Sequence, residues 1–172
     1  MSTKSPRESM VEMNELVLPN DTNLLGNLLG GTLLHWIDIA GAMAAQKHAN
    51  SVVATVCFDS VDFRKPVHVG EIVTLKARVT WVGHTSMEVV VDVYATDYLK
   101  GITRAINRSY VTYVAVDQNG RPKEIPGLIL ETEEEKREFA EAEKRRAERL
   151  KRRQRCDAAE KSNPINSEKP AE

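Results

Sequence analysis

The stretch TLLHWIDIAGAMAAQKH, residues 32–48, decides the fold of this chain. Its apolar residues recur at the spacing of one helix face, as shown by Leu33, Trp36, Ile37, Ala40 and Ala44. The opposite side is also small and apolar, and a helix that is apolar nearly all round is a buried helix. At 1.5 Å per residue it would be about 25 Å long. The sequence therefore predicts one long helix at the centre of the protein.

Runs of β-branched residues before and after this helix are typical of strands. The expected strands cover residues 14–18, 51–63, 71–82, 85–96 and 105–117. Turn residues separate them, among them Gly83-His84 and the DQNG sequence of residues 117–120. The order is thus one strand, the buried helix and four further strands. Because one long helix has one sheet to pack against, we expect an α+β fold with an antiparallel sheet wrapped around the helix.

The charge distribution divides the chain into one domain and a charged tail. The 172 residues carry 24 Lys and Arg against 25 Asp and Glu, and 18 of these charges fall within residues 131–155. A helix with so little apolar surface is expected to be solvated, or part of a disordered tail, rather than a partner-binding element. Residues 1–12 and 156–172 are expected to be disordered. The prediction is a domain over residues 13–127 and a charged helical extension over 128–155.

Composition excludes several classes of protein. A formal net charge of −1 gives no reason to expect a nucleic-acid partner, and no apolar run is long enough for a membrane span. The polar amino terminus is unlike a signal or transit peptide. Cys57 and Cys156 are too far apart to form a metal motif or a disulfide framework, and so few cysteines suit a reducing compartment. We therefore expect a cytoplasmic protein.

Common catalytic motifs are missing from the sequence. There is no G-x-S-x-G nucleophile elbow, no H-E-x-x-H zinc motif and no phosphate-binding loop. The four histidines (His35, His48, His68 and His84) do not have the spacing of zinc ligands. The reaction of this protein is therefore expected to need no metal and no bound cofactor.

Asp38 is the first candidate for a chemical role, because it interrupts the apolar helix. A carboxylate that burial desolvates is a plausible general base near neutral pH. The alternatives are an exposed aspartate at the helix edge, or one paired with His35 one turn earlier. Helix statistics alone favour these alternatives, but the apolar flanks leave few exposed positions.

Two further features precede and follow the helix. Asn23 lies in a turn before Gly30 and Gly31, where unpaired N–H groups of a helix start can stabilise negative charge. The alternative role for Asn23 is a helix cap or an Asx turn. The sequence VGHTSM, residues 82–87, joins two expected strands and is either a plain hairpin or a loop that binds a phosphate or a pantetheine amide.

Taken together, six stretches resemble the hotdog-fold acyl-CoA thioesterases. The similarity is to the cytosolic acyl-CoA hydrolase branch, which includes brain acyl-CoA hydrolase, and it covers about residues 13–127. The stretches are Leu18–Asn23 with Gly26, Gly30–Asp38, Val53–Thr55, Asp62–Glu71, Val82–Met87 and Tyr113–Asp117. Each is weak alone, but six in order are fairly specific. The charged tail lies outside the pattern.

This resemblance implies a hotdog fold, in which a five- to six-stranded antiparallel sheet wraps a long central helix. It also implies homodimers, assembled as trimers of dimers, with the active site between protomers. Asp38 matches the family's catalytic carboxylate, as general base or as nucleophile. Asn23 matches the catalytic amide, which orients water or the carbonyl from the opposite subunit. The backbone N–H near Gly31 would serve as the oxyanion hole.

The resemblance also assigns residues to the coenzyme A side of the cleft. Gly83, Thr85 and Ser86 match positions that line this side, and Thr55 and Phe63 match positions near the acyl or pantetheine channel. Gly30 belongs to the helix start that meets the substrate. Charge alone makes Arg64, Lys65 and Arg104 candidates for the nucleotide phosphates, although plain surface charge explains them equally well. The chain departs from the family by placing two basic residues before Pro66.

The sequence thus predicts an acyl-CoA thioesterase that hydrolyses fatty acyl-CoA to a free fatty acid and CoA. Coenzyme A is part of the substrate and is not a cofactor. One alternative is a non-catalytic acyl-CoA sensor on the same fold. Another is an interaction protein that works through residues 131–155.

Overall fold

The computed structural model describes residues 2–59, 61–62 and 65–161 of the chain, with the side chains of its last helix described as far as Cys156. Eleven elements follow one another in these residues. They are β1 (Thr3–Lys4), η1 (Pro6–Ser9), β2 (Val11–Leu16), η2 (Pro19–Asp21), α1 (Gly30–Ala49), β3 (Val52–Phe58), β4 (Ile72–Val82), β5 (Ser86–Asp97), β6 (Ile102–Val116), β7 (Gly127–Leu128) and α2 (Glu133–Lys161).

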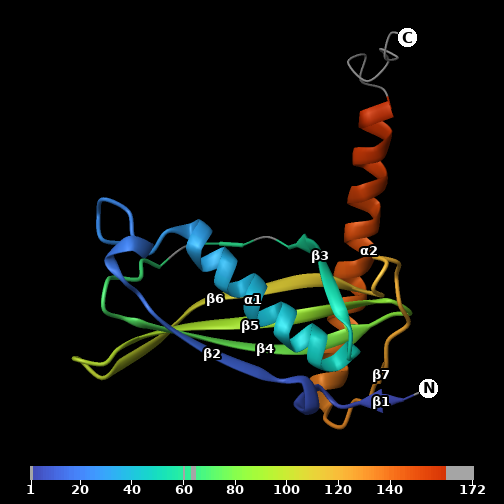
Figure 1. Ribbon diagram of the computed structural model, residues 1–172, viewed down its shortest axis with the longest axis horizontal. Coiled ribbons are helices and arrows are strands. Elements are labelled where there is room, and N and C mark those ends of the chain that lie inside the picture. The colour runs from blue at the N-terminus through green and yellow to red at the C-terminus, as the bar shows by residue number, and fades with distance from the viewer. Residues whose placement is uncertain (1, 60, 63–64, 162–172) are drawn as a thin grey trace.

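The main sheet has five antiparallel strands in the order β2-β4-β5-β6-β3, and it curls around α1 (Figure 1). The predicted fold class is confirmed, with five strands. Helix α1 is three residues longer than expected, because Gly30 and Gly31 belong to its first turn and Ala49 to its last. It ends where Asn50 adopts the left-handed conformation (φ 49°, ψ 42°) and its N–H bonds the Gln46 carbonyl. Among the described residues, no helix is long and apolar enough to cross a membrane.

The core lies between α1 and the concave face of the sheet. Alternate residues of β5 point into it, and Val89, Val91 and Val93 are completely buried there. Ile37 and Ala40 of α1 are buried against this face. The inner face of the sheet thus follows the alternation of apolar side chains along β5.

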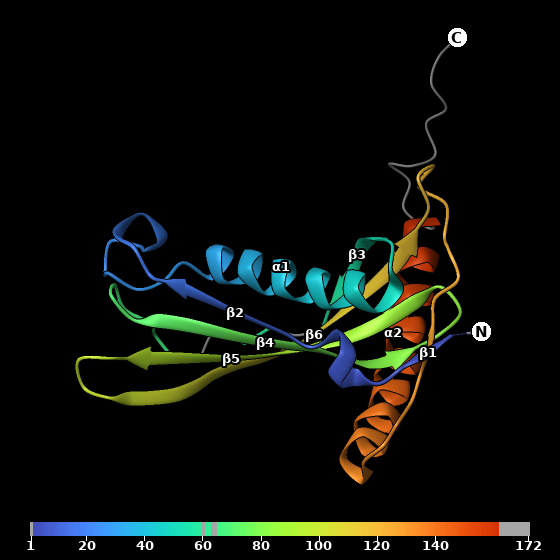
Figure 2. The ribbon, with the colours of Figure 1, turned by 60° about the horizontal axis from the view of Figure 1, so that its bottom comes forward.

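Helix α2 covers the opposite, convex face of the sheet (Figure 2). Glu88, Val90 and Asp92 of β5 point toward this side and are also buried. The helix therefore does not match the expected solvated extension, because its arginines and glutamates pair with the sheet. It also continues to Lys161, so residues 156–161 are helical where disorder was expected. The remaining expected disorder, in residues 162–172, lies outside the described residues.

The first residues are folded where disorder was expected. Strand β1 pairs in parallel with β7, and the Lys4 ammonium donates to the Lys47 carbonyl and to Asn50 Oδ1. Strand β2 begins at Val11, three residues before the expected Asn14, and pairs with β4 along its whole length. These contacts are strand pairing and hydrogen bonds of the Lys4 ammonium, which the polar composition of this stretch does not reveal.

Candidate active site

Asp38 lies near the middle of α1 and is held from two strands. Its Oδ1 accepts a hydrogen bond of 2.8 Å from the Thr55 hydroxyl on β3. The Tyr113 hydroxyl on β6 donates to the Asp38 backbone carbonyl at 3.0 Å and lies 3.3 Å from Oδ1. Within the described residues, no donor reaches Oδ2. The side chain is partly exposed, so within one chain it is neither the desolvated carboxylate expected nor the fully exposed one of the first alternative, and its hydrogen-bond partners do not include His35.

Tyr113 is buried against α1 at Gly41. A Cβ atom at position 41 would collide with the Tyr113 hydroxyl and lie 3.1 Å from two of its ring carbons, so only glycine lets the ring approach. Burial, followed by the negative charge of Asp38, raises the pKa of Tyr113 far above its ordinary value. The phenol therefore stays protonated and donates to Asp38. Neither residue was predicted as part of the site, although a glycine inside an apolar helix is a signal of close packing.

The start of α1 is open. Leu29 occupies the N-cap position without a side-chain cap, so the first N–H groups of the helix lack intrahelical partners. Gly31 is exposed, and a Cβ there would meet no atom within 4 Å. The expected exposed donors at Gly30 and Gly31 are therefore accessible to a negatively charged or developing oxyanion.

A pocket adjoins this helix start. It is lined by Asn27, Leu28, Gly30, Leu33, Lys65, Pro66 and Val67. Its walls are both apolar and polar, and among the described residues no group forms a hydrogen bond with the buried Asn27 Oδ1. Two residues predicted for substrate binding, Gly30 and Lys65, thus line one pocket. The Lys65 ammonium is directed to the Ala105 carbonyl at 3.0 Å.

Asn23 lies in the loop before α1, and its Oδ1 accepts hydrogen bonds from the N–H groups of Leu25 (2.9 Å) and Asn27 (3.2 Å). This is the Asx-turn geometry given as the alternative. Within one chain, the side chain is exposed and has no contact with Asp38. The structure places the two predicted catalytic residues on one side of the sheet without bringing them together.

The predicted coenzyme A loop lies at the other end of the molecule. Gly83, Thr85 and Ser86 form the turn between β4 and β5, closed by a bond of 2.7 Å from Gly83 N–H to the Ser86 carbonyl. Figures 1 and 2 both show this turn far from the start of α1. A single chain therefore cannot bring these residues to Gly31.

The predicted basic residues divide into three cases. Arg104 forms a bidentate ion pair with Glu71 and also donates to the Pro66 carbonyl, so its charge is already compensated. This agrees with a structural role. Lys65 lies at the pocket by the helix start. Arg64, the third predicted basic residue, lies outside the described residues. So does Phe63, which was predicted near the acyl or pantetheine channel.

Residues 25–102 match the thioesterase superfamily. An uncharacterized acyl-CoA thioester hydrolase of Bacillus subtilis is 37% identical, and the alignment covers 98% of this chain and 96% of that protein. The mouse cytosolic acyl coenzyme A thioester hydrolase is 33% identical over 78% of this chain. The alignment covers only 38% of that longer protein.

Solved structures give the same picture. An apo-hexameric acyl-CoA thioesterase is 43% identical with a TM-score of 0.84, covering 88% of this chain and 97% of that chain. An aspartate-to-alanine mutant of the Staphylococcus aureus acyl-CoA hydrolase is 37% identical with a TM-score of 0.87, covering 95% and 100%. Other structures of that hydrolase carry alanine for a threonine and for an asparagine, or hold butyryl coenzyme A and coenzyme A. The fold of the present chain, the open start of its α1 and these similarities show that it belongs to the hotdog-fold acyl-CoA thioester hydrolases of the thioesterase superfamily.

Proposed function

We propose that this protein hydrolyses fatty acyl-CoA to a free fatty acid and CoA at a site centred on Asp38. The observation that carries the proposal is the way its carboxylate is held. Thr55 and Tyr113 both bind Oδ1, which leaves Oδ2 accessible to a water molecule or to the substrate. A carboxylate fixed at one oxygen is oriented for proton transfer by the other.

The relatives support these residue roles. The aspartate, threonine and asparagine replaced in the S. aureus hydrolase have the same spacing along the chain as Asp38, Thr55 and Asn23. We therefore assign Asp38 and Asn23 to the reaction, and Thr55 to the support of Asp38. Thr55 was expected near the acyl channel, and its bond to Asp38 gives it a more specific role.

The chemistry can follow either of two routes from this geometry. In the first, Asp38 takes a proton from water, whose oxygen attacks the thioester carbonyl carbon. In the second, Asp38 attacks the carbonyl itself and water then cleaves the resulting anhydride. In both routes we assign the oxyanion to the N–H groups near Gly31 of the partner chain, because Gly31 and Asp38 of one chain lie about 10 Å apart along α1. The C–S bond breaks and CoA leaves as a thiolate, so no metal or bound cofactor is required.

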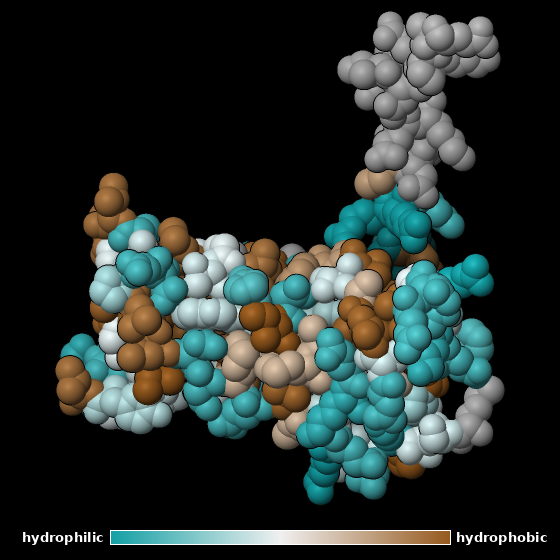
Figure 3. Space-filling view, viewed as in Figure 1, coloured by the Kyte–Doolittle hydropathy of each residue, from teal (hydrophilic) through white to brown (hydrophobic). Residues whose placement is uncertain are grey.

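A complete site needs a second copy of the chain. Among the described residues, strand β3 has a hydrogen-bonded neighbour on one side only, and such an edge strand is a template for pairing with another chain. Apolar side chains of β3 and of the neighbouring face of α1 are exposed, among them Ile39, Met43, Val52 and Val56. Figure 3 shows hydrophobic residues in brown between the hydrophilic ones on the face viewed in Figure 1.

Antiparallel pairing of two β3 strands reverses the direction of the partner's α1. The partner's Asn23 and helix start can then approach Asp38 from the other side. The same reversal can bring the partner's Gly83–Ser86 turn toward the pocket that Lys65 lines. This explains how residues at opposite ends of one chain can serve one site. Because relatives include hexamers, we propose that such dimers assemble as trimers of dimers.

The cytosolic name of the mouse relative supports a cytoplasmic location for this protein. Acyl-CoA is then the substrate in solution. Of the two predicted basic residues that the structure describes, Lys65 is the candidate for the nucleotide phosphates, because Arg104 is neutralised by Glu71.

The test is thiol release from acyl-CoAs of increasing chain length by wild type, Asp38→Asn and His35→Ala. We expect wild type to be active and Asp38→Asn to lose about a hundredfold or more in kcat. The exposed His35, one turn earlier on the same helix, is the control and should leave kcat within about twofold. If the wild type binds acyl-CoA but does not hydrolyse it, the enzyme proposal is wrong and the non-catalytic sensor is favoured.

A further inference from the structure

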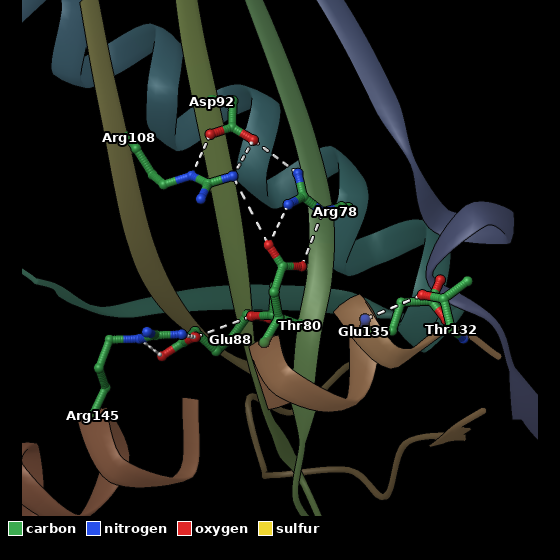
Figure 4. A network of polar contacts seen from close by, with 9 residues as sticks. Arg78, Thr80, Glu88, Asp92, Arg108, Thr132, Glu135 and Arg145 are labelled. Atoms are coloured by element: carbon green, nitrogen blue, oxygen red, sulfur yellow. Dashed lines mark hydrogen bonds and ion pairs between the residues drawn. The ribbon is translucent and has the colours of Figure 1, made fainter. Parts of the chain in front are cut away.

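The convex face of the sheet carries a network of buried charges beneath α2 (Figure 4). Its deepest member is Glu88 on β5, which is completely buried. The Thr80 hydroxyl donates to its Oε1 at 3.0 Å, and two arginines of α2 bind its carboxylate. A buried carboxylate requires such partners. The substrate chemistry described above uses none of these groups.

The two arginines differ in what else they bind. Arg145 donates to both Glu88 oxygens, at 2.8 and 3.2 Å, and its guanidinium stacks 3.7 Å above the Tyr110 ring. Arg149 donates to Glu88 Oε2 at 2.8 Å and also to Asp59 Oδ2 at 2.7 Å. Arg149 is the more buried of the two. It therefore joins the centre of the sheet to the residue that follows β3.

The end of β3 has few other contacts within the sheet, so the ion pair between Arg149 and Asp59 is important for its position. As a sheet edge it bonds only β6 within the chain, and its register shifts by a bulge between Thr55 and Cys57. Asp59 continues the pairing through its N–H, which donates to the Tyr110 carbonyl at 3.0 Å. Beyond the bulge, Arg149 fixes the Asp59 side chain from the convex side. On the concave side, Thr55 donates to Asp38.

We propose that Arg149 is a positioning residue, which holds the end of β3 through Asp59 so that Thr55 keeps the Asp38 carboxylate in its reactive orientation. The inference rests on the proposed role of Asp38 and adds α2 to the machinery of the reaction. Displacement of a catalytic group by about 1 Å can lower a rate by two orders of magnitude. A longer-range tie such as Arg149 is expected to have a smaller effect, of about tenfold on kcat.

The chain offers a matched pair of variants to test this. Arg149→Met and Arg145→Met each remove one guanidinium from Glu88 and leave the other. Only Arg149→Met also removes the close ion pair of Asp59, which then keeps the longer contact of 3.9 Å to Arg152. We expect both variants to lower the melting temperature. Only Arg149→Met should lower kcat, by about tenfold and with KM for acyl-CoA unchanged, while Arg145→Met stays within about twofold of wild type.

Two further variants complete the experiment. Asp59→Asn should lower kcat as Arg149→Met does, and the double variant should be no slower than either, because the two residues act as one unit. Arg149→Lys, which keeps a cation at this position, should recover part of kcat. Circular dichroism below the melting temperature establishes that each variant is folded.

The outcomes separate the inference from the proposed function. Equal kcat values for the two methionine variants would overturn the positioning role of Arg149. A change in KM for acyl-CoA without a change in kcat would overturn it as well. A wild type without thioesterase activity would overturn the proposed function instead. A loss of kcat in Arg149→Met that Asp59→Asn does not reproduce would also contradict the proposed route through β3.

Discussion

At the scale of single residues, the site depends on a helix position that admits no side chain. Gly41 lets Tyr113 approach α1 closely enough to bond the carbonyl and the carboxylate of Asp38. Tyr113 is neutral and buried, so it orients the carboxylate without adding a charge. The reactive group is thus held by two hydroxyls, one from each of two neighbouring strands.

Gly41→Ala tests this arrangement by the sign of its effect on stability. In a helix interior, alanine is more favourable than glycine by about 1 kcal/mol. At position 41 the new methyl would overlap Tyr113, and overpacking of this kind destabilises by about 1–3 kcal/mol. We expect a lower melting temperature and a lower kcat. Adding Tyr113→Phe should recover part of the stability but not kcat, because the hydroxyl overlap is removed while two ring carbons stay 3.1 Å from the new methyl. An unchanged melting temperature for Gly41→Ala would contradict the close approach.

His48 gives the fold an acid sensitivity. The side chain is completely buried at the end of α1, with Nε2 3.0 Å from the Pro126 carbonyl, and no described residue forms a hydrogen bond with Nδ1. Burial, aided by Lys4, lowers the pKa of His48, and it outweighs the opposite effects of the Pro126 bond and Glu8. Below pH 6.5, the ordinary pKa of histidine, His48 binds a proton in the unfolded chain but remains neutral in the folded chain.

The free energy of unfolding should therefore fall as pH drops below 6.5, and continue to fall until His48 is protonated in the folded state as well. Urea unfolding between pH 7.5 and about 5 measures this slope. His48→Gln can still donate to the Pro126 carbonyl but does not titrate, so its slope in this window should be shallower. Equal slopes for the two proteins would exclude His48 as the cause.

At the scale of elements, α1 and the strands were predictable because burial leaves a periodic trace. The inward-facing residues of β4 and β5 alternate, and α1 is apolar on nearly all sides. Helix α2 leaves no such trace, since it is attached by charges. Arg78, Asp92 and Glu138 form ion pairs between β4, β5 and α2. In sequence, these residues are indistinguishable from solvated ones.

The residues of the site likewise fall into those that the sequence predicts and those that it does not. Asp38, Asn23 and Gly31 could be named because a polar residue or glycine run stands out in an apolar or turn-rich stretch. The support from Tyr113 and Gly41, and the link from Arg149 to Asp59, depend on contacts between distant segments. A single sequence contains no periodicity that reports such contacts.

A chain that stops after Leu130 tests the contribution of α2. It retains the core between α1 and the sheet but loses the arginine partners of Glu88. We expect it to fold with a free energy of unfolding lower by about 2 kcal/mol or more. Its kcat should fall at least as far as that of Arg149→Met. Unchanged activity would instead favour a helix that serves only a separate partner.

At the scale of the whole molecule, the proposed dimer places Asp38 and Asn23 of one site on different chains. Mixed dimers of Asp38→Asn and Asn23→Ala then contain one intact site each. Co-expression of the two inactive variants, followed by thiol-release assay, should recover about one quarter of the wild-type activity when chains pair at random. No recovery in verified mixed dimers would place both residues of a site on one chain.

The charged underside of the sheet has a consequence during synthesis. Helix α2 follows every strand of the main sheet in the chain, so the sheet can form before its cover has been translated. The surface that waits for it carries Arg78, Glu88, Asp92 and Arg108. Water can hydrate these groups in the interval, whereas an apolar underside would invite aggregation on the ribosome. The charged convex face of the sheet thus keeps the nascent domain hydrated until α2 has been translated and packs against it.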